Sequence, residues 1–170
     1  MRLRKNLNLP IMVFVLIIAM LAVASCLPVF FKDVDFSVYL SERLVRTDNS
    51  GFFTVAVLIN EPASFRAVSF CFEISEGLTL LDVSLGEAAE NQGGEIFWGY
   101  SCDSSFFVHA GFLWQTQPII DSGTIILLLL TAENEGVLSL SGVECVDDEL
   151  RTLDVRIKEP NRTLVLSEGK

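Results

Sequence analysis

The sequence predicts an all-β domain, built as an antiparallel β-sandwich and preceded by an export signal. Three observations support this prediction. Short apolar segments with period-two alternation recur along the chain, clusters of turn-forming residues separate them, and no long segment after residue 26 shows the 3.6-residue period of an amphipathic helix. Closely spaced short strands with turn signals between them are typical of a β-sandwich.

Nine segments carry the strand pattern. Residues 34–40 alternate strictly between apolar and polar side chains, as in a half-buried strand, and the turn cluster at residues 47–51 separates them from the next strand. The polar stretch at residues 87–94, which contains a Gly pair, is predicted to be a loop. The predicted strands are residues 34–40, 52–59, 66–75, 78–85, 95–101, 105–114, 123–131, 137–145 and 150–157.

The strand at residues 66–75 shows the register most clearly. Phe70 and Phe72 lie in phase with other apolar residues and are predicted to be in the core, whereas Glu73 lies on the opposite face. Residues 125–130 are apolar without alternation, so both faces of that strand need cover. Two interpretations stay open: a central strand whose outer face lies beneath a loop, the N-terminal segment or the tail at residues 163–166, or an exposed stripe for dimerisation or docking.

The N-terminus predicts export. Residues 1–10 carry three cations and no acid, and residues 11–24 are uncharged and apolar, which is the pattern of a secretory signal peptide. This apolar segment is short for a membrane-spanning helix, which needs about 20 residues. An uncleaved signal anchor is the alternative.

Residues 23–26, Val-Ala-Ser-Cys, resemble a lipobox, after which bacterial lipoproteins are cleaved and diacylated on the new N-terminal Cys. Ordinary cleavage after Ala24 is an alternative. We expect an extracytoplasmic lipoprotein, anchored to the membrane in the periplasm or at the cell surface. The predicted parts are a signal peptide at residues 1–25, a lipid anchor on Cys26 with a linker at residues 26–33, a sandwich at residues 34–158 and a C-terminal tail at residues 159–170.

The charge of the exported part excludes one class of partner. After Cys26 the chain has nine basic and 22 acidic residues, a net charge of −13. Such a surface repels nucleic acid and is not attracted to anionic lipid headgroups. Membrane contact is therefore expected through acyl chains alone.

Signals for catalysis and metal binding are scarce. His109 is the only histidine and is predicted to be a solvated strand residue, and no nucleophile elbow, zinc-protease motif or phosphate-binding loop is present. Residues 147–149, Asp-Asp-Glu, lack the spacing of a calcium loop and are predicted to form a solvated acidic turn. We expect no enzymatic activity, no metal and no cofactor. Whether any two of Cys71, Cys102 and Cys145 form a disulfide stays open.

Aromatic residues are concentrated between residues 97 and 114. Large aromatics are most often core residues. If Trp98, Tyr100 and Trp114 face outward instead, they make a platform on which sugar rings stack.

Two stretches that lie far apart in the sequence resemble the two ends of the cohesin domain of bacterial cellulosomal scaffolds. The first contains Ala67-Val68-Ser69-Phe70 and a segment from Gly77 to Gly86. The second runs from Gly123-Thr124 to Ala132 and from Gly136 to Val143. The resemblance covers residues 34–158 and implies a nine-stranded jelly-roll sandwich without catalytic chemistry.

The resemblance also implies a binding face. In cohesins a helical, calcium-loaded dockerin docks on the sheet formed by the third, fifth, sixth and eighth strands, which here are residues 66–75, 95–101, 105–114 and 137–145. The implied function is a membrane-anchored binding module that holds a dockerin-like protein or a polysaccharide-active assembly at the cell surface. Direct carbohydrate binding through Trp98, Tyr100 and Trp114, or a structural role in a homo-oligomer, is the alternative. The outward residues implied for partner binding are Ser69, Glu73, Phe97, Phe107 and His109.

Overall fold

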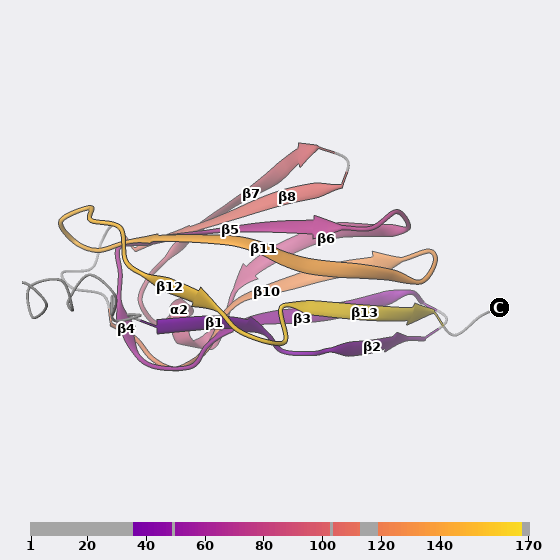
Figure 1. Cartoon of the computed structure of the whole chain (residues 1–170), viewed down its shortest axis with the longest axis horizontal. Helices are drawn as coiled ribbons and strands as arrows, with labels where there is room; N and C mark the ends of the chain where they lie inside the picture. The colour runs from indigo at the N-terminus through magenta and orange to yellow at the C-terminus, as the bar shows by residue number, and fades with distance from the viewer. Residues whose placement is uncertain (1–35, 49, 103, 113–118, 168–170) are drawn as a thin grey trace, which may run out of the picture. The chain divides into compact units, whose positions relative to one another are not determined.

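The structure, a computed structural model, describes residues 36–48, 50–102, 104–112 and 119–167. These residues form a sandwich of two mixed sheets around a hydrophobic core, with a separate two-stranded ribbon (Figure 1). The predicted β-sandwich is therefore confirmed. Within the described ranges the one helix is the short α2 (Glu87–Glu90), and no helix there has the length and apolar composition of a membrane span.

The first sheet has five strands in the order β12-β1-β3-β10-β6. β1 pairs in parallel with β12, and the remaining pairs are antiparallel. The strands are β12 (Val155–Ile157), β1 (Phe36–Leu40), β3 (Phe52–Ile59), β10 (Gly123–Ala132) and β6 (Leu78–Leu85).

The second sheet has six strands in the order β2-β13-β11-β5-β8-β7, and β13 pairs in parallel with β2. The ribbon joins β4 (Ala63–Ser64) to β9 (Ile119–Ile120). The six strands are β2 (Leu44–Thr47), β13 (Arg162–Ser167), β11 (Gly136–Val146), β5 (Ala67–Ile74), β8 (Ser105–Gly111) and β7 (Glu95–Cys102).

The core lies between the two sheets and follows the predicted register of β5. Phe70 and Phe72 are fully buried, and Glu73 is exposed, as predicted. Phe72 stacks on Phe106 of the neighbouring β8, with ring centroids 4.8 Å apart. Such stacked pairs add to the free energy gained by removing the rings from water.

A β-bulge explains part of the apolar run at residues 125–130. The ladder between β10 and β3 shifts register between Thr124 and Ile126, so the consecutive residues Ile125 and Ile126 are both buried. Leu128 and Leu130 then continue the inward phase. The outward Leu129 is 38% exposed, so the outer face of this interior strand is only partly covered.

The structure corrects several details of the prediction. The described residues contain thirteen strands, whereas nine were predicted, and each large sheet contains a parallel pair, whereas an antiparallel sandwich was predicted. The added strands β2, β4 and β9 are two to four residues long, too short for alternation to reveal them. α2 lies within the predicted loop at residues 87–94.

The predicted C-terminal tail, residues 159–170, contributes a strand to the sandwich. β13 pairs with β11 and β2, and its Thr163 and Val165 are fully buried. The sandwich thus extends beyond residue 158, to Ser167. Because β13 lies in the six-stranded sheet, residues 163–166 do not cover the outer face of β10 in the other sheet.

Candidate functional site

The four strands that the resemblance identified lie side by side in one sheet, in the order β11-β5-β8-β7. Successive side chains of a strand point to opposite faces. The buried phase of β5 and β8 therefore leaves Ser69 and Glu73, and Phe107 and His109, on the solvent side, and Phe97 of β7 joins them. We call the solvent side of these four strands the outer face. All five residues predicted for partner binding lie on it.

The strand register places four of the outward residues in one row. Phe97 lies opposite His109, His109 opposite Ser69, and Ser69 opposite Glu144 of β11. Directly opposed side chains on one face of a sheet are neighbours. The row thus runs across the outer face from the aromatic Phe97 on β7 to the acidic Glu144 on β11.

Three rings form a cluster at the aromatic end of this row. Phe107 and His109 have ring centroids 5.0 Å apart, and Phe97 lies 5.9 Å from Phe107. The rings of Phe97 and His109 are nearly parallel, with centroids 6.4 Å apart. Phe97 is 65% exposed, and this exposed apolar ring within a cluster marks the surface as a candidate contact site.

Two glycines on this part of the outer face leave space for neighbouring side chains. A Cβ atom on Gly99 would lie 3.2 Å from Cζ of Phe107, so the ring of Phe107 lies over the glycine. On the other side, a Cβ atom on Gly142 would lie 3.4 Å from Cβ of Cys71. Gly99, Phe107, Cys71 and Gly142 form one row, in which the two glycines make room for the ring and the thiol.

An open hollow of about 150 Å³ lies beside the ring cluster. His109 and Glu144 stand on different strands around it, and Ala67 and Ser69 are the small residues between them. It is lined by Ala67, Val68, Ser69, His109, Glu144 and Val146.

The prediction missed Glu144 because of a bulge. The phase of β11 shifts between Leu140 and Gly142, so Glu144 lies opposite the outward Ser69. Ser141 is the extra residue at the bulge, and its hydroxyl donates a hydrogen bond to the carbonyl oxygen of Cys71. The sequence signal that could have indicated this bulge is Gly142, the one glycine in the interior of β11.

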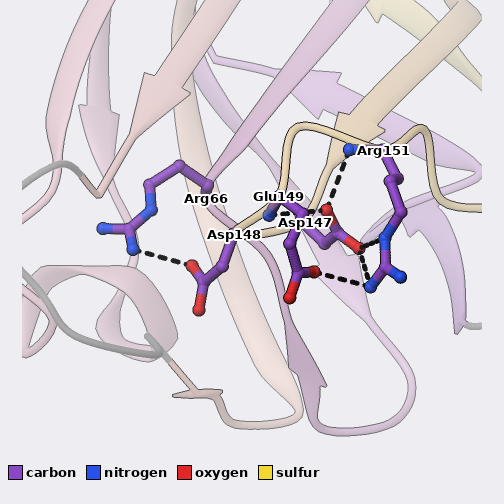
Figure 2. A network of polar contacts seen from close by, with 5 residues as sticks. All are labelled: Arg66, Asp147, Asp148, Glu149 and Arg151. Carbon is purple, nitrogen blue, oxygen red and sulfur yellow. Dashed lines mark hydrogen bonds and ion pairs between the residues drawn. The ribbon is translucent and has the colours of Figure 1, made fainter.

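The acidic residues of the turn at residues 147–149, beside the outer face, form ion pairs with two arginines (Figure 2). Asp147 accepts hydrogen bonds from the side chain of Arg151 at 2.7 Å and from its backbone N–H at 2.8 Å, and Glu149 pairs with the same guanidinium. Asp148 pairs with Arg66 at 2.7 Å. The predicted solvated turn is therefore a turn of ion pairs, in which only Glu149 has a mostly exposed acidic side chain.

The contact between Asp147 and Arg151 shifts the pKa of both side chains. The hydrogen bond from the Arg151 side chain lowers the pKa of Asp147, and Asp147 in turn raises the pKa of Arg151. Arg66 also donates a hydrogen bond to the carbonyl oxygen of Phe112 at 2.8 Å. It thus ties the end of β8 to the turn that follows β11.

The residues proposed as a sugar platform do not share an exposed plane. Trp98 is half-buried and packs against the core, and its ring lies at 70° to that of Tyr100. The phenol of Tyr100 is hydrogen-bonded to the backbone of Leu80. Trp114 lies outside the described residues, as does Cys26.

No disulfide joins the three cysteines within the described ranges. Cys71 and Cys102 are exposed and Cys145 is buried. A hydrogen bond with the Ser105 hydroxyl at 2.8 Å lowers the pKa of the Cys102 thiol. Among the described residues there is also no cluster of three or more His, Cys, Asp or Glu side chains arranged to hold a metal ion.

No protein-family model matches the chain, and no curated protein matches it. Its likeness to solved structures is clear. The sixth cohesin of scaffoldin B from Acetivibrio cellulolyticus, solved in complex with a dockerin, superposes with a TM-score of 0.65 at 15% identity and covers 79% of this chain and 100% of its own.

Two further structures come from other settings. The non-cellulosomal cohesin of the archaeon Archaeoglobus fulgidus has a TM-score of 0.63 at 13% identity, with 80% of this chain and 93% of that chain covered. The cohesin module of a family 33 glycoside hydrolase from Clostridium perfringens has a TM-score of 0.62 at 12% identity, with 80% and 100% covered. The described part is thus a β-sandwich module with an open, aromatic sheet face. Its fold is that of a cohesin domain, as the sequence resemblance implied.

Proposed function

We propose that this chain is a non-catalytic binding module that docks a protein partner on its outer face. The exposed ring cluster of Phe97, Phe107 and His109 carries this proposal. Interface energy concentrates in a few aromatic anchors surrounded by weaker polar contacts. Ser69 and Glu73 supply polar positions of that kind beside the rings.

The proposed partner is a dockerin-like helical protein. The support is the fold, since the Acetivibrio cellulolyticus cohesin and a Clostridium thermocellum cohesin were solved as cohesin–dockerin complexes. The outer face carries Glu73 and Glu144, and the exported part has a net charge of −13. A complementary partner surface combines apolar groups with basic side chains.

Isothermal titration calorimetry with a partner protein recovered from the native envelope tests the docking face. Phe107→Ala is expected to weaken binding by about 2 kcal/mol or more, the size of an anchor residue. The matched control is Phe52→Ala, an exposed phenylalanine on the five-stranded sheet, which is expected to leave binding unchanged. Thermal melting of both variants checks that the fold persists. Equal affinities of the two variants would contradict the proposed face.

We further propose that Cys26 is diacylated and anchors the domain outside the cytoplasm. The support is the lipobox-like sequence at residues 23–26. Two acyl chains hold a protein firmly at a membrane, whereas one gives marginal binding. Mass spectrometry of the membrane fraction is expected to show a diacylated N-terminal Cys26, and Cys26→Ser should release the domain or leave the leader uncleaved. An unmodified mature N-terminus would contradict the anchor.

Direct carbohydrate binding has weaker support. Trp98 packs against the core, the hydroxyl of Tyr100 is hydrogen-bonded to Leu80, and the two rings lie at 70° to each other, so they do not form one flat sugar platform. A glycan array separates the two functions. Glycan retention that is lost in Trp98→Ala and kept in Phe107→Ala would favour carbohydrate binding over protein docking.

A further inference from the structure

β7 is the last strand of the six-stranded sheet, and its outer edge is free of any described strand (Figure 1). It pairs on one side with β8, in regular register from Glu95 to Tyr100 and with a bulge between Tyr100 and Cys102. A free strand edge presents unpaired backbone N–H and C=O groups that another strand can bind. The edge of β7 is eight residues long, and Glu95 at one end is its only charged residue.

The side chains of β7 have the composition of an interior strand. Phe97 is exposed on the outer face, while Ile96 and Trp98 point toward the core and are nevertheless only half-buried. The corresponding inward residues of β8, such as Phe106 and Val108, are fully buried. The difference arises because β8 has a strand on each side and β7 has one. An added strand would complete the burial of Ile96 and Trp98.

The other sheet edges lack these features. β12 and β2 have three and four residues, and β2 carries the exposed Arg46. β6 is as long as β7, but the Tyr100 phenol binds both the N–H and the C=O of Leu80, and the ladder with β10 is bulged beside it. Short strands, charges, bulges and bonded backbone groups all block edge pairing. In β7 the one charge, Glu95, and the one bulge, between Tyr100 and Cys102, stand at opposite ends, so among the described residues the stretch from Ile96 to Tyr100 has neither.

We propose that β7 pairs antiparallel with β7 of a second copy of this chain, which joins two six-stranded sheets into one. The sequence of β7 favours a second copy of the same strand as the partner at this edge. In an antiparallel pair the two Glu95 side chains lie at opposite ends, so the only charges of the strand do not meet. The apolar side chains of both copies meet along the middle of the strand instead.

The geometry makes this assembly a closed dimer. The other side of β7 is occupied by β8, so each copy offers one edge and no third copy can add. A two-fold axis perpendicular to the sheet turns both outer faces to the same side. The inference goes beyond the proposed docking function, because it concerns association of the chain with itself, and it leaves each outer face open.

Sedimentation equilibrium of the chain without any partner tests the dimer. We would use the chain from Cys26 onward with Cys26→Ser, since residues 36–167 enclose their own core, and a reductant to keep Cys71 and Cys102 from cross-linking. Phe97→Lys places a charge on the edge and is expected to raise the dimer Kd by about tenfold or more. Because both copies are acidic, added salt is expected to strengthen the wild-type dimer.

Phe52→Lys is the matched control. It changes another exposed phenylalanine, which lies opposite Thr131 on the outer side of the five-stranded sheet, and should leave the dimer intact. In a Trp114→Phe background, Trp98 emission is expected to shift to the blue as the protein concentration rises. A wild-type chain that stays monomeric up to about 1 mM, or a dimer that Phe52→Lys breaks and Phe97→Lys spares, would overturn the proposal.

Discussion

The phenolic oxygen of Tyr100 accepts a hydrogen bond from the backbone N–H of Leu80 at 2.9 Å and donates one to the carbonyl oxygen of the same residue at 3.2 Å. Tyr100 belongs to β7 and Leu80 to β6, so the contact joins the edges of the two sheets. It also occupies backbone groups of β6 that would otherwise be open to another strand.

Tyr100→Phe tests this relationship. The change removes both hydrogen bonds and leaves two part-buried backbone groups without the phenol, so the free energy of unfolding should fall by about 1–3 kcal/mol. Urea denaturation measures the loss. Tyr39→Phe, at the only other tyrosine, is expected to change stability by less than about 0.5 kcal/mol. Equal effects of both changes would show that the Leu80 contact does not stabilise the fold.

The register of β5 predicts opposite outcomes for two neighbouring residues. Phe72 is fully buried and stacked on Phe106, so Phe72→Ala should cost about 3–5 kcal/mol of stability. Glu73 is exposed, so Glu73→Ala should cost less than about 0.5 kcal/mol. Denaturant midpoints of the two variants provide the measurement, and a costly Glu73→Ala would contradict the register.

The Asp147–Arg151 contact makes the stability of the fold depend on pH in the acidic range. Because the Arg151 hydrogen bond lowers the pKa of Asp147 in the folded state, the contact stabilises the fold above the unfolded-state pKa of about 3.8. This stabilisation is lost as the pH falls through the lower, folded-state pKa. Melting temperatures measured from pH 7 to about pH 2 should fall less in Asp147→Asn than in the wild type. Arg151→Gln should reduce the acid dependence in the same way, and an unchanged profile in both variants would contradict the contact.

The Cys102 thiol is expected to react with alkylating agents at pH values below the ordinary pKa of a cysteine. The Ser105 hydroxyl lowers the pKa of Cys102, and the thiol is exposed. In a Cys71→Ser background, Ser105→Ala should slow alkylation by iodoacetamide at neutral pH, because less thiolate is present. The rates should converge at high pH, where both thiols are ionised. A rate that does not respond to Ser105→Ala would contradict the assigned hydrogen bond.

Much of the sandwich follows from local sequence alone. Alternation along β3, β5 and β8 identifies which side chains reach the core, and it places Ser69, Phe107 and His109 on the solvent side. This works because successive side chains of a strand point to opposite faces, so one buried face determines the other.

Other features depend on which strands become neighbours. The bulge between Leu140 and Gly142 brings Glu144 to the outer face, and the bulge after Thr124 buries Ile125 and Ile126 together. A bulge is a mismatch between two paired strands, so the pairing has to be known before its effect on side-chain direction follows, even where a glycine such as Gly142 marks its place. β13 was assigned to a tail for a related reason, since its six residues form a strand between β11 and β2.

The all-β architecture, the core face of the long strands and the outward position of the ring residues all follow from side-chain periodicity within single segments. Three other features are visible only in the folded chain: Phe97, Phe107 and His109 form one cluster, Arg151 pairs with Asp147, and β7 lies at the end of its sheet. These features depend on long-range backbone pairing, which brings together residues from separate strands and places β7 at an edge of its sheet.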